Sequence, residues 1–376
     1  MKAYLDNAAT TPLHPKVKAA MWEVIDEFGN PSSIHAWGRR TRILIEKART
    51  AIAEMLGVSP GEIFFTSGGT EAINTAVYGA VIDRGVRTII TSPIEHKAVL
   101  KSAARAQALR PDVHIHYIQH HPDGAFDLDH LHDLLKKAPR GKTLVALMHA
   151  NNEVGILNDA AAVSALAQQY EALFLCDTVQ TLCHTPFQLP ELGAHYAACS
   201  AHKFHGPKGV GFFYMNKEAK INPLIHGGAQ ERGMRAGTEN VPGIVGLHKA
   251  FEIGMEALRT RPDHLLRLRN HMRDRIRALF PEATIWESDN GAVLPTVLAV
   301  SFPLNEKTEM MQMRLDMEGV AVSAGSACTS GAAQRSHVLD ALNAPKDIVP
   351  LRFSFGDLTT FDEVNYAVEA LQKILA

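Results

Sequence analysis

A lysine between two histidines is the first feature of this sequence whose residue types indicate chemistry. In CSAHKFHGPKGVGFF an apolar run ends at Ser200, and Lys203 follows between His202 and His205. Ligands of α/β folds bind beyond the carboxyl ends of the strands. A lysine amine near other cations loses its proton more readily and can form a Schiff base. The segment therefore predicts a Schiff-base lysine, with a solvated surface lysine as the alternative.

A carboxylate ends a second apolar run. In ALFLCDTVQ the run ends at Asp177, and Gln180 follows one turn later. A buried carboxylate is costly unless a cation meets it. The protonated ring nitrogen of pyridoxal phosphate is such a cation, and an aspartate is a known partner for it. Asp177 is therefore a candidate partner of that cofactor, while an aspartate that caps the next turn is the alternative.

Small residues in FFTSGGTEAINTA indicate an anion site. An apolar strand is expected to end at Thr66, and a helix to begin near Glu71 after the turn SGGT. Free backbone N–H groups at a helix start, with the hydroxyl of Thr70, can hold a phosphate. An ordinary Ser/Thr-capped helix start gives the same pattern. Two nucleotide-binding motifs are excluded. RGKT at 140–143 resembles the end of a P-loop, but the position where the first glycine of that motif belongs is Lys136. HGPKGVG at 205–211 has the wrong glycine spacing for GxGxxG.

One of the four cysteines has neighbours unlike those of the others. Cys328 lies in AGSACTSGAA, where no neighbour is large enough to bury a thiol. Such surroundings favour a reactive thiol over a structural one. Cys176, Cys183 and Cys199 lie in or beside apolar runs and are expected to fill the core.

Strands and helices that could position these residues alternate from about residue 16 to residue 250. The strand-like runs are EIFFT, VRTIIT, VHIHYI, TLVALM, ALFLCD, HYAACS and GVGFFYM, and helix-like segments occur at 71–83, 96–108, 127–137 and 159–170. This alternation predicts an α/β fold with a largely parallel, buried seven-stranded sheet and helices on both faces.

The pattern changes after residue 250. The charged stretch RTRPDHLLRLRNHMRDRIRAL is typical of a helix, strands are expected near TVLAVSF and PLRFSF, and helices at 305–317 and 361–374. We therefore expect a large cofactor-binding domain at 15–255. Residues 1–14 and 256–376 would form a smaller α+β domain that carries Cys328.

Composition narrows the function classes. The chain of 376 residues has 38 basic and 40 acidic residues and a net charge of −2, which disfavours DNA or RNA as the main ligand. No apolar run is long enough for a signal peptide or a membrane span, so a cytoplasmic protein is expected. The 19 histidines show no HExxH spacing, so no metal is expected.

Motifs along nearly the whole chain resemble those of the cysteine desulfurases, which are fold-type I pyridoxal phosphate enzymes of the class V aminotransferase group. They are YLDNAATTP, GNPSSIH, TSGGTEAINTA, EHKAV, HANNEVG, DTVQ, SAHKFHGPKG, RAGTEN, GSACTSG and LRFSFG, in the family's order. The segment around Cys328 resembles the long-loop branch of the family. Two stretches differ from the family pattern, Leu175-Cys176-Asp177 and His226-Gly227-Gly228-Ala229.

The resemblance implies a role for each matching residue. It implies Lys203 as the Schiff-base lysine, His96 stacked on the cofactor ring, Asp177 at the ring nitrogen, Gln180 at the ring hydroxyl, Gly69, Thr70, Ser200 and His202 around the phosphate, Asn152 and Arg352 at the substrate carboxylate, and Cys328 as the nucleophile. His96 is also a candidate proton shuttle. Thr238 matches a phosphate contact donated by the other subunit, which implies a homodimer with shared active sites.

The implied activity converts L-cysteine to L-alanine, with the sulfur passed to Cys328 as a persulfide. In the family this sulfur goes to an acceptor or scaffold protein for iron–sulfur cluster assembly or tRNA thiolation. A selenocysteine lyase or an aminotransferase on the same scaffold stays open, as does a non-catalytic regulator. The presence of both Lys203 and Cys328 favours an enzyme.

Overall fold

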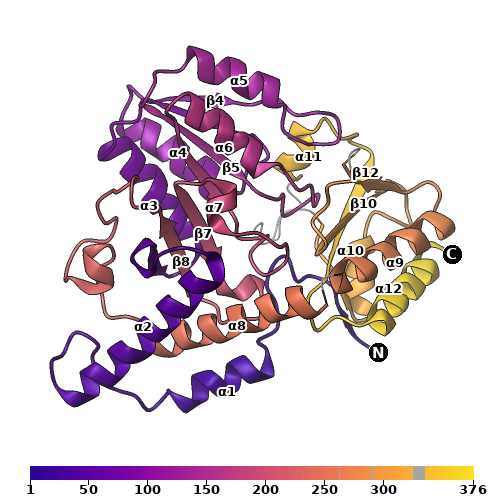
Figure 1. Cartoon of the computed structure of the whole chain (residues 1–376). Coiled ribbons are helices and arrows are strands. Elements are labelled where there is room, and N and C mark those ends of the chain that lie inside the picture. Colours follow the sequence, from indigo (N-terminus) through magenta and orange to yellow (C-terminus); the bar gives the residue numbers. More distant parts are fainter. Residues whose placement is uncertain (262, 289–290, 325–334) are drawn as a thin grey trace.

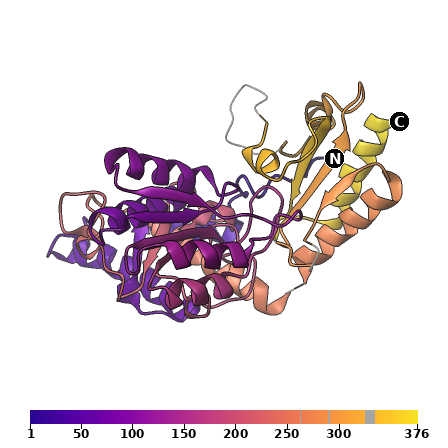
Figure 2. The ribbon, with the colours of Figure 1, turned by 90° about the horizontal axis from the view of Figure 1, so that it is seen from above.

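The computed structural model describes residues 1–376 except 262, 289–290 and 325–334. Its larger part contains a seven-stranded sheet, and its smaller part a three-stranded sheet (Figure 1 and Figure 2). In spatial order the larger sheet consists of β2 (Ile63–Thr66), β8 (Gly211–Met215), β7 (Tyr196–Ser200), β6 (Leu173–Asp177), β5 (Thr143–Met148), β3 (Thr88–Thr91) and β4 (His114–Tyr117). Within this sheet β8 runs in the direction opposite to that of the other six strands. The predicted mostly parallel sheet is thus confirmed.

Helices cover both faces of this sheet because its side chains alternate between two cores. Ile90, Val145 and Phe174 pack with α2 (Ala36–Leu56), α5 (Leu128–Lys137), α6 (Ala160–Gln169) and α8 (Val241–Thr260). Ile89 and Leu144 pack on the other face with α3 (Gly69–Ile82) and α4 (Lys97–Leu109). Buried strands with apolar residues on both faces are typical of parallel sheets. Cys176, Cys183 and Cys199 are buried in the first of these cores, as expected.

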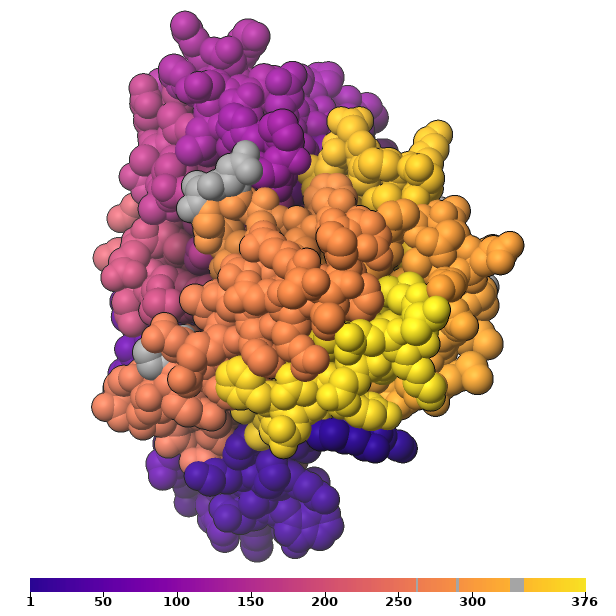
Figure 3. Space-filling model, turned by 90° about the vertical axis from the view of Figure 1, so that its right-hand side faces the viewer, coloured from indigo at the N-terminus to yellow at the C-terminus, as the bar shows by residue number. Residues whose placement is uncertain are grey.

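The smaller part packs two helices on an antiparallel sheet. The sheet has the order β12 (Ile348–Ser354), β10 (Val297–Pro303) and β9 (Thr284–Trp286). Its core is shared with α9 (His264–Leu279) and α12 (Phe361–Leu375), whose orange and yellow residues lie near the middle of the face seen in Figure 3. Residues from the start of the chain join it, because β1 (Ala3–Tyr4) pairs in parallel with β11 (Val320–Ala321).

The remaining elements are short or lie at the periphery. They are α1 (Pro15–Glu23), α7 (Leu189–Leu192), α10 (Met311–Met317), α11 (His337–Ala341) and the single turns η1 (Pro60–Glu62), η2 (Ala201–Lys203) and η3 (Gln230–Gly233). Helix α1 packs against α8.

Three details differ from the sequence predictions. The helix predicted at 305–317 begins only at Met311, because Thr308 and Asn305 bond each other and Pro303 in a turn. Strand β4 lies at the sheet edge with mostly exposed side chains, although a buried strand was expected. The long charged stretch is divided between α8 and α9, since Arg261 leaves the helical conformation with φ −140° and ψ 52°.

Candidate active site

A cavity of about 270 Å³ lies where the parallel strands of the larger sheet end. Most residues that the sequence singled out line it: Gly69, Thr70, His96, Asn152, Asp177, Gln180, Ser200, His202, Lys203 and Arg352. Thr238 does not line this cavity and is exposed. Cys328 lies outside the described residues. One cavity therefore collects side chains from both sheets and from several loops.

The N-terminus of α3 forms one end of the cavity. Its N-cap residue, Gly68, provides no side-chain cap, and the N–H of Gly69 donates to Ser200 Oγ at 2.7 Å. A Cβ atom at Gly69 would lie 2.6 Å from Cγ2 of Val179, so only glycine fits there. Uncapped N–H groups and the helix dipole favour an anion at this end.

His202 also lines the cavity, and its side chain is neutral near pH 7. Burial and the nearby charges of Lys203 and Lys208 lower the pKa of His202 to about 4. Its Nδ1 lies 3.2 Å from Oγ1 of Thr10. A neutral imidazole can act as a hydrogen-bond donor to an anion through one ring nitrogen.

Asp177 ends β6 and is 7% exposed. Its Oδ1 accepts a hydrogen bond from the N–H of Val179 at 3.0 Å. Burial raises the pKa of Asp177 above its ordinary value, although His96, that hydrogen bond and Lys203 act in the opposite direction. A further cation beside this carboxylate would favour its ionised form.

Lys203 reaches the cavity from the turn η2, directly after β7. Its Nζ donates to the backbone oxygens of Ala8 at 2.7 Å and Ala9 at 2.9 Å. The segment that carries these oxygens is fixed to the turn, because Thr11 donates both its N–H and its Oγ1–H to the oxygen of His202. Residues from the start of the chain thus orient the amine.

His96 is both the N-cap of α4 and a cavity residue. Its Nδ1 accepts a hydrogen bond from the N–H of Ala98 at 3.1 Å, so the proton of the neutral ring is on Nε2. Burial, supported by the charge of Lys203 and opposed by Asp177, lowers the pKa of His96. The ring is therefore neutral near pH 7. Gln180 donates from Nε2 to the backbone oxygen of Ala8 at 3.1 Å. Lys203 donates to the same oxygen, so both side chains contact the same N-terminal segment.

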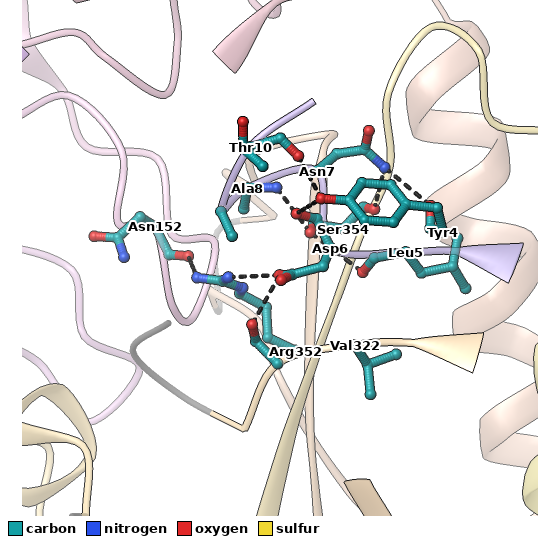
Figure 4. Close-up of polar contacts among 12 residues, drawn as sticks. Tyr4, Leu5, Asp6, Asn7, Ala8, Thr10, Asn152, Val322, Arg352 and Ser354 are labelled. Atoms are coloured by element: carbon teal, nitrogen blue, oxygen red, sulfur yellow. Dashed lines mark hydrogen bonds and ion pairs between the residues drawn. The ribbon is translucent and has the colours of Figure 1, made fainter. Parts of the chain in front are cut away.

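Arg352 provides a buried guanidinium from β12. Its side chain is 3% exposed, Nη1 donates to the backbone oxygen of Asn152 at 2.9 Å, and Nη2 donates to Oδ1 of Asp6 at 2.9 Å. Figure 4 shows the guanidinium between these two acceptors. Guanidinium groups bind carboxylates in a two-pronged geometry, so Arg352 can hold a carboxylate ligand at the cavity wall.

Sequence reasoning missed several residues of this cavity. The backbone oxygens of Ala8 and Ala9 could not be anticipated, because alanine offers no functional side chain. Glu153 and His337 also line the cavity, and His337 Nε2 donates to the oxygen of Glu95 at 3.0 Å. The only sequence signal for Glu153 was its place beside Asn152 in HANNEVG.

Metal ligation and membrane insertion find no support within the described ranges. No group of three or more histidine, cysteine, aspartate or glutamate side chains among these residues could hold a metal ion. In the same part of the chain, none of the helices has the length and hydropathy to cross a membrane.

Comparison with known proteins gives full-length matches. The family model described as Aminotransferase class-V matches residues 3–367. The protein described as cysteine desulfurase IscS of Dictyoglomus turgidum is 42% identical over 380 residues, which cover 100% of this chain and 94% of that protein.

Solved structures are similar over the same length. One described as a NifS-like protein has a TM-score of 0.90 at 39% identity and covers 100% of this chain and 99% of its own. Another, described as SspA in complex with cysteine, has a TM-score of 0.79 at 28% identity, with 95% and 100% covered. The likeness of the chain trace therefore extends over both sheets.

Proposed function

Since the chain belongs to the aminotransferase class-V family, we propose that it is a cysteine desulfurase that uses pyridoxal phosphate. The observation that carries the proposal is one cavity that contains the amine of Lys203, the buried carboxylate of Asp177 and the uncapped start of α3. The name of the relative in Dictyoglomus turgidum, 42% identical over the full chain, supports the same activity. The solved structure with bound cysteine supports L-cysteine as the substrate.

The cavity residues fit pyridoxal phosphate. Gly69, Thr70, Ser200 and His202 would surround its phosphate, because they line the cavity at the N-terminus of α3, where the N-cap residue Gly68 provides no side-chain cap. Asp177 would meet its ring nitrogen, which would supply the cation that this buried carboxylate favours. When bound, the cofactor supplies an electron sink for carbanion chemistry.

Two neighbouring residues would complete the cofactor site. His96 lines the same cavity and would lie against the ring, and Gln180 would bond its hydroxyl. Lys203 would hold the cofactor through its amine.

The chain's own residues would then divide the chemistry. Arg352 and Asn152 would hold the substrate carboxylate, and the amine of Lys203 would remove the Cα proton. His96 carries its proton on Nε2 and would transfer it within the cavity. The thiolate of Cys328 would attack the sulfur of L-cysteine, so that an S–S bond to Cys328 forms, the C–S bond breaks, and protonation of the carbon gives L-alanine.

The family resemblance supports further proposals about assembly. We propose a homodimer in which Thr238 of each subunit contacts the cofactor phosphate of the other, since Thr238 is exposed and lies outside its own subunit's cavity. We also propose that the protein supplies sulfur for iron–sulfur clusters, with which the name cysteine desulfurase IscS of several relatives is consistent, and that an acceptor or scaffold protein receives this sulfur. We further propose a cytoplasmic location.

The division into residues 15–255 and 1–14 with 256–376 also stays a proposal. The pairing of β1 with β11 supports the assignment of the first residues to the smaller domain. The proposed boundary lies within α8, which spans Val241–Thr260.

The decisive experiment mixes the purified protein with L-cysteine and a thiol reductant and measures alanine and sulfide. We expect equal amounts of both, and loss of both in Cys328→Ser although the cofactor stays bound. Lys203→Ala should retain no cofactor covalently after borohydride reduction and denaturation. Bound cofactor without either product would overturn the desulfurase proposal, and release of selenide from selenocysteine alone would favour a selenocysteine lyase.

A further inference from the structure

Asp6, Ser323 and Arg352 form a hydrogen-bonded group, here called the Asp6 cluster, of which Arg352 lines the cavity (Figure 4). Oδ1 of Asp6 accepts two hydrogen bonds, from Nη2 of Arg352 at 2.9 Å and from Oγ of Ser323 at 2.8 Å. The opposite nitrogen of Arg352 donates to the backbone oxygen of Asn152, whose side-chain amide points away from the guanidinium in Figure 4. The guanidinium is thus held at both of its terminal nitrogens.

The backbone fixes the Asp6 cluster as firmly as its side chains do. Arg352 and Ser323 exchange both main-chain hydrogen bonds, at 2.7 and 3.3 Å. On the other side, the N–H of Ser354 donates to the oxygen of Leu5 at 2.7 Å, and the N–H of Ala8 donates to Oγ of Ser354 at 2.9 Å. These strand contacts hold the backbone of Asp6 beside that of Arg352.

The charge of the Asp6 cluster has a consequence for any carboxylate ligand. The ion pair already neutralises Arg352, and the carboxylate of Asp6 is only 20% exposed. A substrate carboxylate bound to the same guanidinium would lie roughly 5–6 Å from that of Asp6, given ordinary hydrogen-bond lengths. Two like charges at this separation in a partly buried site repel each other appreciably. Asp6 must therefore weaken carboxylate binding while it orients the arginine.

We propose that Asp6 is a positioning residue that limits the affinity of Arg352 for the carboxylate shared by substrate and product. The inference rests on the proposed function, in which Arg352 binds that carboxylate. L-cysteine and L-alanine carry the same carboxylate group, so Asp6 weakens the binding of both to a similar extent. Binding energy that is common to the ground state and the transition state lowers KM without raising kcat. A limited affinity keeps the product from occupying the site.

The test compares Asp6→Asn with wild-type holoenzyme by calorimetric titration of L-alanine and of ethylamine, which is alanine without its carboxylate. The asparagine side chain would keep an oxygen acceptor for Arg352 and Ser323 and lose only the charge. We expect L-alanine to bind about tenfold more tightly, within a range of roughly three- to thirtyfold, and ethylamine to bind as before. KM for L-cysteine should fall by a similar factor, and kcat should not rise.

Matched variants separate the charge from other effects. Ser323→Ala removes a hydrogen bond to the same oxygen but keeps the charge, and should not tighten L-alanine binding. Asp6→Ser, neutral and smaller, repeats the test if Asp6→Asn folds poorly. Unchanged or weaker L-alanine binding in both neutral variants, or an equal change for ethylamine, would overturn the inference. Arg352→Gln tests the assumption beneath it: if L-alanine binds unchanged there, the carboxylate role of Arg352 is wrong, whatever Asp6 does.

Discussion

Loss of Arg49 should destabilise the protein far more than loss of a surface arginine. Arg49 of α2 donates to both carboxylate oxygens of Glu231, at 2.7 and 2.8 Å, and to the backbone oxygen of Ile63 at 2.7 Å. The N–H of Phe65 donates to the same glutamate at 2.7 Å, and the guanidinium carbon lies 4.8 Å from the centre of the Phe65 ring. The two charged side chains are 2% and 1% exposed. This ion pair therefore joins α2, β2 and η3 inside the protein.

The size of the effect follows from the burial of the partner. Arg49→Met keeps an apolar side chain of similar length but leaves the carboxylate of Glu231 buried without its cation. Breaking a buried ion pair in this way costs about 3–5 kcal/mol. For a protein of this size that corresponds to a fall in Tm of roughly 4–6 °C. Arg140→Met is the matched control, since its ion pair with Glu171 is 57% and 63% exposed and is worth at most about 1 kcal/mol.

The Tm of both variants is measured by thermal unfolding, followed by circular dichroism at one scan rate and with saturating cofactor. The double variant Arg49→Met/Glu231→Gln should recover part of the loss, because it no longer buries an unpaired charge. Equal falls in Tm for Arg49→Met and Arg140→Met would refute the reasoning, as would a double variant whose loss equals the sum of the two single losses.

Three further predictions concern the cavity. The lowered pKa of His96 predicts that kcat/KM falls on the acid side as this ring gains a proton, with a midpoint below the ordinary histidine value of about 6.5; a midpoint above pH 7 would contradict the assignment. Gly69→Ala places a Cβ atom 2.6 Å from Cγ2 of Val179, so the variant should lose bound cofactor at least tenfold faster during dialysis, measured by cofactor absorbance. In the control Gly61→Ala the new Cβ atom has its nearest neighbour at 3.6 Å, and this variant should keep its cofactor. Asp177→Asn should lower kcat by roughly 100-fold or more with the cofactor still bound, and a loss below tenfold would argue against a ring partner.

Local patterns were sufficient to predict the main elements and part of the cavity. The apolar runs before Asp177 and Lys203 became β6 and β7, and both residues lie at the strand ends where the alternating pattern places ligands. Gly57 ends α2 with a φ of 70°, a left-handed conformation that glycine adopts readily. These features depend on neighbours within a few residues, which a single sequence records.

The contacts that complete the cavity depend on residues far apart in the chain. Asp6 and Arg352 are 346 positions apart, and Lys203 is 195 positions from the oxygen of Ala8 that it contacts. Neither pairing has a local signal, because each bond forms only when distant segments of the chain lie side by side. The exposure of β4 was missed for a similar reason, since its position at the sheet edge follows from the strand order and not from its own residues.

The contacts between residues 3–9 and the last strands determine when the cavity can form during synthesis. The N–H of Leu5 bonds the oxygen of Ala321, and the oxygen of Leu5 bonds the N–H of Ser354. A ribosome makes the first of these segments more than 300 residues before the second, and domains generally fold in the order in which they emerge. The seven-stranded sheet can therefore form while the oxygens that orient Lys203 still lack their support. A nascent chain that stops before β12 should therefore contain a folded seven-stranded sheet and an incomplete cavity. We expect such a chain to bind the cofactor only after β12 has been synthesised.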